Sequence, residues 1–231
     1  MAERVHRVVA LNGSPRKNWN TAMLLEKALE GAKSLNAQTK LIHLYDLNFK
    51  GCVSCFFCKT KKNYLSGRCG HKDDLTEVLE LVENSTGLIL GSPIYVGDVT
   101  GVMRCFLERY AFINLAYDPK AFAVRTQGQA VGLIYTMNVQ EEDLDAMGYG
   151  PIFRSHKSLL ERLQSPIVEQ LFACDTLQFD DYSRFHAPMF DEAHKKRVRS
   201  EQFPIDLKKA YDLGRLLASQ SHSQAHSQGH S

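Results

Sequence analysis

No run in this 231-residue sequence approaches the roughly 20 consecutive apolar residues that a membrane-spanning helix needs. Residues 1–7 are charged, and the apolar run after them is too short for the hydrophobic region of a signal peptide. Neither sign of charge dominates, since 28 Lys and Arg residues face 26 Asp and Glu residues, for a formal net charge of +2. Nucleic-acid binders usually carry a clustered basic face. We therefore expect a cytoplasmic protein that binds neither membrane nor nucleic acid.

Three common motifs are also missing. The sequence has no Gly-x-Gly-x-x-Gly dinucleotide fingerprint and no Gly-Lys-Ser/Thr phosphate loop. It has no Gly-x-Ser-x-Gly nucleophile elbow either, so nothing indicates a hydrolase. What the chain does have is a hydrophobic fraction of 44%, which at this length allows one sizeable core without disulfides or bound metal ions to stabilise it.

Short apolar runs alternate with stretches of helical periodicity along the chain. Such alternation predicts βαβ units and a parallel sheet. The expected strands are residues 7–11, 39–45, 87–90, 131–136 and 176–181, the third being ended by Gly91-Ser92-Pro93. Two expected helices begin at Asn20-Thr21 and at Asp73-Asp74. Three more are expected over 100–112, over 155–172 with a bend at Pro166, and over 191–219 with an interruption at Pro204.

The predicted fold class is α/β, a doubly wound five-stranded parallel sheet in the order 2-1-3-4-5 with helices on both faces. Three of the strands are nearly continuous apolar runs, as expected for strands covered on both faces. We divide the chain into a main domain at 1–183, a helical extension at 184–218 and a tail at 219–231. The tail contains only Ser, Gln, His, Ala and Gly, a composition that predicts disorder.

Polar and small residues follow the first predicted strand and lead directly into a helix. Free backbone N–H groups at a helix start, together with the helix dipole, favour a phosphate. The side chains of Ser14, Asn20 and Thr21 add hydrogen-bond donors, and Arg16 adds charge. An ordinary strand-to-helix turn explains the segment equally well.

Two further loops follow predicted strands at the same edge. In Ser92-Pro-Ile-Tyr-Val-Gly97, Tyr95 is flanked by residues that let the backbone approach a planar ring, although a simple Pro-Gly turn is the alternative. Thr136 and Asn138 follow the fourth strand, where they can reach the far edge of such a ring. In an open α/β sheet, ligands bind outside the carboxyl ends of the strands.

Four of the six cysteines, Cys52, Cys55, Cys58 and Cys69, lie in one segment after the second strand. In a reducing compartment, such a group indicates metal binding or redox activity more than structural disulfides. The tight triple spacing suits a cuboidal iron–sulfur cluster on the same edge of the sheet as these loops, with Cys69 as the fourth ligand. A reduced cysteine-rich loop, or a cysteine pair that forms a disulfide on oxidation, remains the alternative. We expect Cys105 and Cys174 to be structural.

The segments GSPRKNWNT and SPIYVGDVTG, with CVSCFFC between them, resemble the flavodoxin-like NADPH-dependent FMN reductase superfamily, and within it the iron–sulfur flavoprotein branch. The resemblance implies bound FMN, with NAD(P)H as electron donor. It assigns the phosphate to the first loop and the isoalloxazine to the second. Trp19 departs from the pattern, since the family usually has glycine there. The residues expected to bind FMN are Ser14, Arg16, Asn18, Asn20, Thr21, Pro93, Ile94, Tyr95, Gly97, Thr136 and Asn138.

We therefore expect an FMN-dependent oxidoreductase that takes electrons from NAD(P)H or a small redox protein. It would pass them to a small-molecule acceptor, or relay them through a [4Fe–4S] cluster. The flavin supplies the reactivity, and Tyr95 is the one side chain expected to tune it. The alternatives are a flavodoxin-type electron carrier without its own substrate and a cysteine-based redox sensor. The resemblance also implies a homo-oligomer.

Overall fold

The computed structural model describes residues 5–124 and 128–226, with side chains described through residue 220. The main sheet contains β1 (Val5–Asn12), β2 (Gln38–His43), β3 (Ser85–Tyr95), β4 (Asp98–Val99), β7 (Ala130–Met137) and β8 (Val168–Cys174). The helices are α1 (Asn20–Lys33), α2 (Leu75–Glu83), α3 (Gly101–Asn114), α4 (Gly150–Arg162), α5 (Glu192–Glu201) and α6 (Phe203–His226). A separate hairpin joins β5 (Leu115–Asp118) and β6 (Ala121–Ala123). The short 3-10 helices are η1 (Leu44–Asp46), η2 (Phe57–Lys59), η3 (Glu141–Asp143) and η4 (Tyr182–Arg184).

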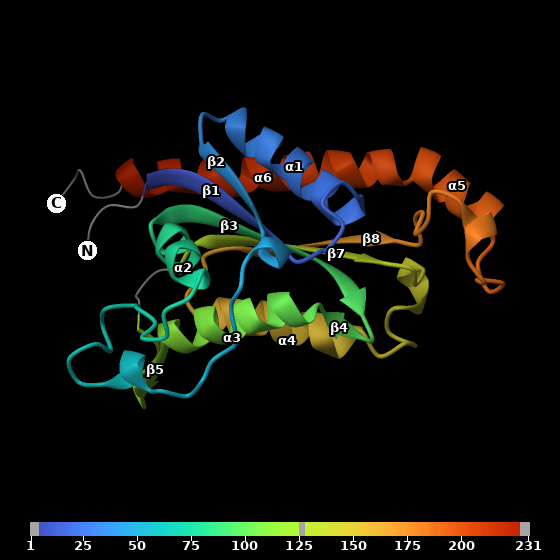
Figure 1. Ribbon diagram of the computed structural model, residues 1–231. Helices are drawn as coiled ribbons and strands as arrows, with labels where there is room; N and C mark the ends of the chain where they lie inside the picture. Colours follow the sequence, from blue (N-terminus) through green and yellow to red (C-terminus); the bar gives the residue numbers. More distant parts are fainter. Residues whose placement is uncertain (1–4, 125–127, 227–231) are drawn as a thin grey trace.

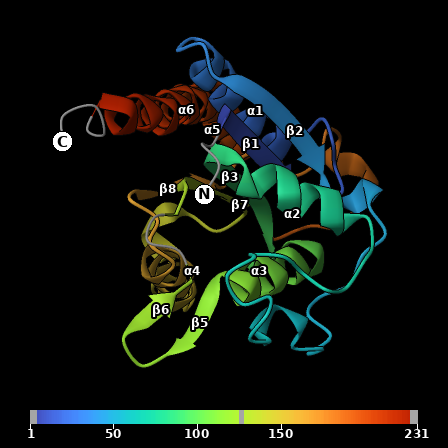
Figure 2. The same ribbon diagram turned by 90° about the vertical axis from the view of Figure 1, so that its left-hand side faces the viewer.

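Five parallel strands run in the order β2-β1-β3-β7-β8, which confirms the predicted sheet. Helices cover both faces, α1 and α6 on one and α2, α3 and α4 on the other (Figure 1). Figure 2 shows the β5–β6 hairpin on the α3 and α4 side, away from α1 and α6. All eight residues of β7 are buried, because helices cover the sheet on both sides of this inner strand.

The register brings the carboxyl ends of the strands to one edge. Asn12 at the end of β1 pairs with His43 of β2 and Gly91 of β3, and Pro93 pairs with Thr136 of β7. The loops that follow β1, β3 and β7 therefore meet at this edge, where a doubly wound sheet binds its ligand.

The predicted fifth strand is wrong in position. The helix expected at 155–172 ends at Arg162, and the strand is Val168–Cys174. Pro166 lies between the two elements, so it separates a helix from a strand and does not bend a helix. Proline cannot continue the helical hydrogen-bond ladder.

Two other boundaries differ from expectation. β3 continues through Gly91-Ser92-Pro93 to Tyr95, because Pro93 pairs with β7 and Ile94 pairs with Val99 of β4. Helix α6 continues to His226, through much of the tail expected to be disordered, and positions 227–231 lie outside the described residues. Leu217 and Ala218 are buried, and once a helix is anchored each further residue adds a hydrogen bond at little cost.

Helices α1 and α6 cross in close contact through two glycines. A Cβ on Gly31 would lie 1.9 Å from the carbonyl oxygen of Tyr211, and one on Gly214 would lie 1.7 Å from that of Ala28. The last helix therefore packs backbone to backbone against the helix whose first turn follows the predicted phosphate loop. None of the helices in the described part of the chain has the length and apolarity of a transmembrane segment.

Candidate functional site

The loop between β1 and α1 is closed by its own side chains. Asn12 Oδ1 accepts a 2.9 Å hydrogen bond from the Ser14 N–H, and Ser14 Oγ accepts one of 3.1 Å from the Arg16 N–H. Trp19, the residue before α1, gives no side-chain hydrogen bond to the helix start. The first N–H groups of α1 have no partner within the helix, so this uncapped start can donate to an anion.

The segment after β8 lies against this loop. The carbonyl oxygen of Leu177 accepts from Asn20 Nδ2 at 2.9 Å and from Trp19 Nε1 at 3.3 Å. Arg16 donates to the carbonyl oxygen of Gln178 at 2.6 Å, and its guanidinium stacks 4.0 Å from the centroid of the Trp19 ring. Trp19, the residue that departs from the family pattern, therefore packs against the Arg16 side chain.

The loop after β3 is a tight hairpin. Tyr95 pairs with Asp98, and the two residues between them, Val96 and Gly97, have φ angles of 52° and 90°. Two consecutive residues with positive φ are typical of the hairpin turn whose twist matches its strands. The turn presents the Tyr95 ring, which is 46% exposed, at the carboxyl edge of the sheet.

Two electrostatic effects connect the hairpin to the first loop. Burial raises the pKa of Tyr95, Tyr45 raises it further, and the positive charge of Arg16 opposes the shift. Burial lowers the pKa of Arg16, against the influence of Tyr95 and Asp180. Tyr95 and Arg16 thus lie close enough to affect one another, as a shared site requires.

The end of β7 completes the edge. Thr136 and Thr21 share a hydrogen bond of 2.8 Å between their hydroxyl oxygens, so the third loop contacts the start of α1. Asn138 donates to the side chain of Gln178 and accepts from Lys195 at 3.2 Å. Of the residues predicted to bind FMN, Ser14, Asn20, Thr21 and Thr136 are buried, whereas Arg16, Asn18 and Tyr95 are exposed.

A chain of polar groups, buried at Tyr135 and His156 and partly exposed at Asp98, ties the hairpin to α4. The Tyr135 hydroxyl lies 3.1 Å from His156 Nδ1, and His156 Nε2 lies 3.4 Å from the carboxylate of Asp98. Burial lowers the pKa of His156, and Asp98 opposes that shift. This chain positions the hairpin that carries Tyr95.

Sequence reasoning missed the contribution of α5. Lys195 is 2% exposed and forms a 2.6 Å ion pair with Asp175, which also lies 2.6 Å from His194 Nε2. Arg199 donates to Asn20 Oδ1 at 2.8 Å. Lys195 and Arg199 are spaced four residues apart, which places both on one helix face. The four-residue spacing could be seen in the sequence, but nothing in the sequence indicated which surface this helix face contacts.

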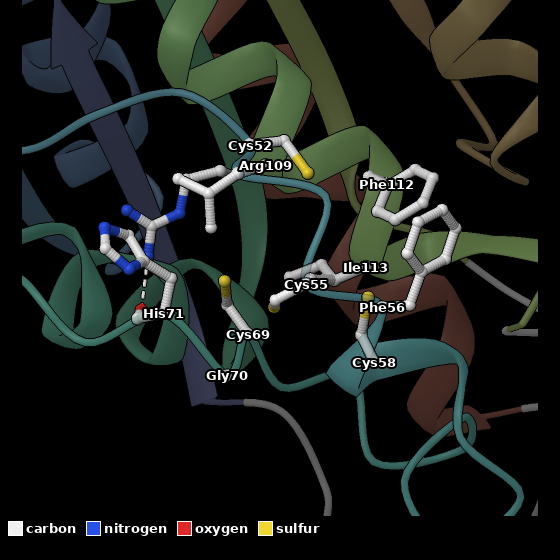
Figure 3. A pocket seen from close by; sticks show the side chains of 11 residues that line it. Cys52, Cys55, Phe56, Cys58, Cys69, Gly70, His71, Arg109, Phe112 and Ile113 are labelled. Carbon is white, nitrogen blue, oxygen red and sulfur yellow. Dashed lines mark hydrogen bonds between the residues drawn. The ribbon is translucent and has the colours of Figure 1, made fainter.

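The four cysteines of the predicted cluster line one pocket, here called the cysteine pocket. Figure 3 shows them around it, with Arg109 and His71 on one side and Phe56 and Phe112 on the other. All four are free thiols; Cys58 is 6% exposed, and burial raises the pKa of its thiol. The ten residues between Cys58 and Cys69 therefore do not keep Cys69 away from the other three cysteines.

The cysteine pocket does not lie where sequence reasoning expected, at the carboxyl edge of the sheet. Its wall includes Arg109, Phe112 and Ile113 from the second half of α3, whereas Gly101 at the start of α3 follows the β3–β4 hairpin. At 1.5 Å per residue, Gly101 and Phe112 are about 17 Å apart along the helix axis. Figure 1 shows the cysteine loop beside β5, at the end of α3 away from β4. The loop leaves the edge after β2 because Lys59 is anchored on the carbonyl oxygens of Phe112 and Leu115.

Comparison with known proteins agrees with this geometry. The family model for NADPH-dependent FMN reductase matches residues 6–142. An iron–sulfur flavoprotein of Clostridioides difficile is 30% identical over 169 residues, which cover 71% of this chain and 72% of the relative. One from Archaeoglobus fulgidus is 38% identical over 103 residues, 45% of this chain and 48% of the relative. The chain spans about half the length of several curated relatives that it matches.

Solved structures share the fold at low identity. An NAD(P)H:quinone oxidoreductase from Methanothermobacter marburgensis is 18% identical with a TM-score of 0.61, covering 93% of this chain and 96% of that one. An FMN-dependent NADH-azoreductase from Bacillus anthracis, solved with FMN, is 12% identical with a TM-score of 0.58, and the match covers 93% of this chain and 98% of that one. The family match, the relatives and the flavodoxin-like fold agree. The chain therefore belongs to the NADPH-dependent FMN reductase family, in its iron–sulfur flavoprotein branch.

Proposed function

We propose that this protein takes electrons from NAD(P)H or a small redox protein onto FMN and relays them through a [4Fe–4S] cluster held by Cys52, Cys55, Cys58 and Cys69. Two features of one chain carry the proposal. Two loops that resemble the FMN-binding pattern meet the loop after β7 at the carboxyl edge, and the four cysteines line a single pocket. The names of its relatives, iron–sulfur flavoproteins, support the same assignment.

The first loop fits the phosphate of FMN. The start of α1 is uncapped, and the Thr21 hydroxyl and the Ser14 side chain lie beside it. Arg16 adds a positive charge from the exposed side. In this proposal the Tyr95 ring borders the isoalloxazine, since the β3–β4 hairpin presents it at the same edge.

The four thiols that line the cysteine pocket suit a cluster. Within the described residues, no three histidine, cysteine or carboxylate side chains converge closely enough to hold one metal ion. A cuboidal cluster binds each cysteine through a separate iron, so its four ligands surround a cage and do not converge on one point. Thiolate ligands also suit iron–sulfur chemistry.

Bound FMN accepts electron pairs or single electrons, and an iron–sulfur cluster exchanges single electrons. The residues of this chain hold and orient both groups. Exposed basic residues on the cysteine loop, Lys61, Lys62 and Arg68, lie beside the cluster site, where they favour an acidic partner. Charge reversal at these positions without any effect on the rate of reduction would indicate only a solvated face. The proposal includes a homo-oligomer, which sedimentation of the FMN-loaded protein tests.

The first test is an absorption spectrum of protein purified without oxygen, with iron, acid-labile sulfide and FMN assayed on the same sample. We expect flavin bands over a broad, reducible shoulder, and about four irons per chain. NADPH oxidation with a quinone acceptor then tests the donor. Flavin without iron or sulfide would leave an FMN reductase with a cysteine-rich loop. Protein unable to bind FMN would favour the cysteine-based sensor.

We expect R16M to weaken FMN binding by about tenfold or more, because a hydrogen bond to a charged group contributes about 1.5–3 kcal/mol. Riboflavin, which lacks the phosphate, should bind both proteins equally. Fluorescence titration of the apoprotein measures both affinities. The matched control is K17M, since Lys17 is the neighbouring exposed cation and pairs with Asp46 at 2.6 Å. Equal weakening of FMN and riboflavin binding would place Arg16 away from the phosphate.

A further inference from the structure

Arg109 is the most deeply buried cation at the wall of the cysteine pocket, and nothing in the proposed function uses it. It is 1% exposed, although it lies on α3 among apolar residues. Burying a charge is costly unless it is paired and hydrogen-bonded. Arg109 forms a 2.5 Å ion pair with Asp73, so one part of its guanidinium is satisfied.

The same guanidinium holds both ends of the cysteine loop. Its Nη1 donates to the carbonyl oxygen of Lys50 at 3.3 Å, two residues before Cys52. Its Nη2 donates to the carbonyl oxygen of His71 at 2.8 Å, two residues after Cys69. One side chain therefore brings together the first and fourth cysteines, which are 17 positions apart in the sequence.

One donor of Arg109 is left over. Its Nε is buried and has no hydrogen-bond partner in the described part of the chain. Arg109 lines the pocket together with all four cysteines, as Figure 3 shows. A buried unsatisfied N–H is costly, so native structures rarely leave one without a partner.

We propose that Arg109 is the positioning residue of this pocket: it closes the cysteine loop through Lys50 and His71, and its free Nε–H donates to a sulfur of the bound cluster. The inference rests on the proposed cluster and adds a role for a residue that is not one of its ligands. It accounts for a buried charge, an orphaned donor and the closure of a long loop by one side chain.

The expected consequence is electrochemical. Hydrogen bonds to the sulfur atoms and nearby charge set the reduction potential of an iron–sulfur cluster. Reduction adds a negative charge to the cluster. A fixed cation and an N–H donor stabilise that charge, so Arg109 should raise the potential. The negative charge of Asp73, 2.5 Å from Nη1, should act in the opposite direction.

The test compares R109M, R109K and D73N with the parent holoprotein in a redox titration followed by electron paramagnetic resonance. We expect R109M to lower the equilibrium constant for one-electron reduction of the cluster at least tenfold, a negative shift of about 59 mV. R109K keeps the charge but lacks the Nε–H, so its shift should be in the same direction and smaller. D73N should shift the potential upward. The matched control is R104M, the same substitution at an exposed position of α3.

Iron, sulfide and FMN assays on each sample separate the outcomes. A purely structural role for Arg109 predicts loss of iron without a change in the potential of the clusters that remain. If R109M cannot hold the cluster, the reduction potential of the cluster in R109K tests the inference instead. Full iron content with an unchanged potential in R109K and R109M would overturn the inference and leave the proposed function intact. Parent protein without iron and sulfide would refute the cluster itself, and the role of Arg109 with it.

Discussion

Replacing Cys58 with serine is expected to remove most of the iron and acid-labile sulfide from protein purified without oxygen, against about four irons per chain in the parent protein. Cys58 is the one buried cysteine of the four, at 6% exposure, and it lies on η2, where it lines the pocket. Lys59, the next residue, anchors this turn on the end of α3. Serine offers a harder oxygen ligand, which an iron–sulfur cluster disfavours.

The matched control for C58S is C174S. Cys174 is also partly buried, and burial raises the pKa of its thiol to about 12, but it lies at the end of β8 outside the cysteine pocket. Both variants should keep the FMN content and the circular dichroism of the parent, because serine is close to cysteine in size. Full iron content in C58S, or equal loss in C174S, would contradict the assigned ligand set.

Replacing Gly214 with alanine is expected to lower the free energy of unfolding by about 2 kcal/mol. The new Cβ would lie 1.7 Å from the carbonyl oxygen of Ala28, so helices α1 and α6 must separate. Overpacking of this kind typically costs about 1–3 kcal/mol, and contact with backbone atoms favours the upper end. The better helix propensity of alanine returns up to about 1 kcal/mol. For a chain of this size, the melting temperature should fall by about 4–8 °C.

The matched control for G214A is G101A. A Cβ on Gly101, the first residue of α3, meets nothing within 4 Å. Urea unfolding should show G101A unchanged or slightly more stable than the parent, while G214A unfolds at lower urea concentration. The same midpoint for G214A and the parent would mean that the two helices are not packed as closely as the structure describes.

The strands at the centre of the sheet were predictable, and the edge strand β8 was not. Inner strands such as β1 and β7 are covered on both faces, so each contains a nearly continuous apolar run. β8 is an edge strand whose burial is irregular, and Glu169 and Gln170 interrupt its apolar pattern. Together with the leucines of α4 its sequence mimics helical periodicity, and periodicity alone cannot separate a short strand from a helical segment.

The same contrast holds for the candidate site. The meeting of the loops after β1, β3 and β7 could be predicted, because parallel strands bring their carboxyl ends to one edge. The contacts of Leu177, Gln178 and Arg199 with the first loop could not be predicted, because more than 150 residues separate these residues from their partners in the sequence. Arg109 on an amphipathic helix would ordinarily be expected on its exposed face.

By itself, the sequence determined the fold class, the order of the five parallel strands, the edge where the loops predicted to bind FMN meet, and the group of four cysteines. These features follow from local patterns of hydrophobicity, turn residues and ligand spacing. The tertiary structure alone decided where the cysteine loop lies, which charge is buried beside it, and which helices touch through Gly31 and Gly214. Those features depend on how distant surfaces fit together, and a side chain's burial is a property of its neighbours in space.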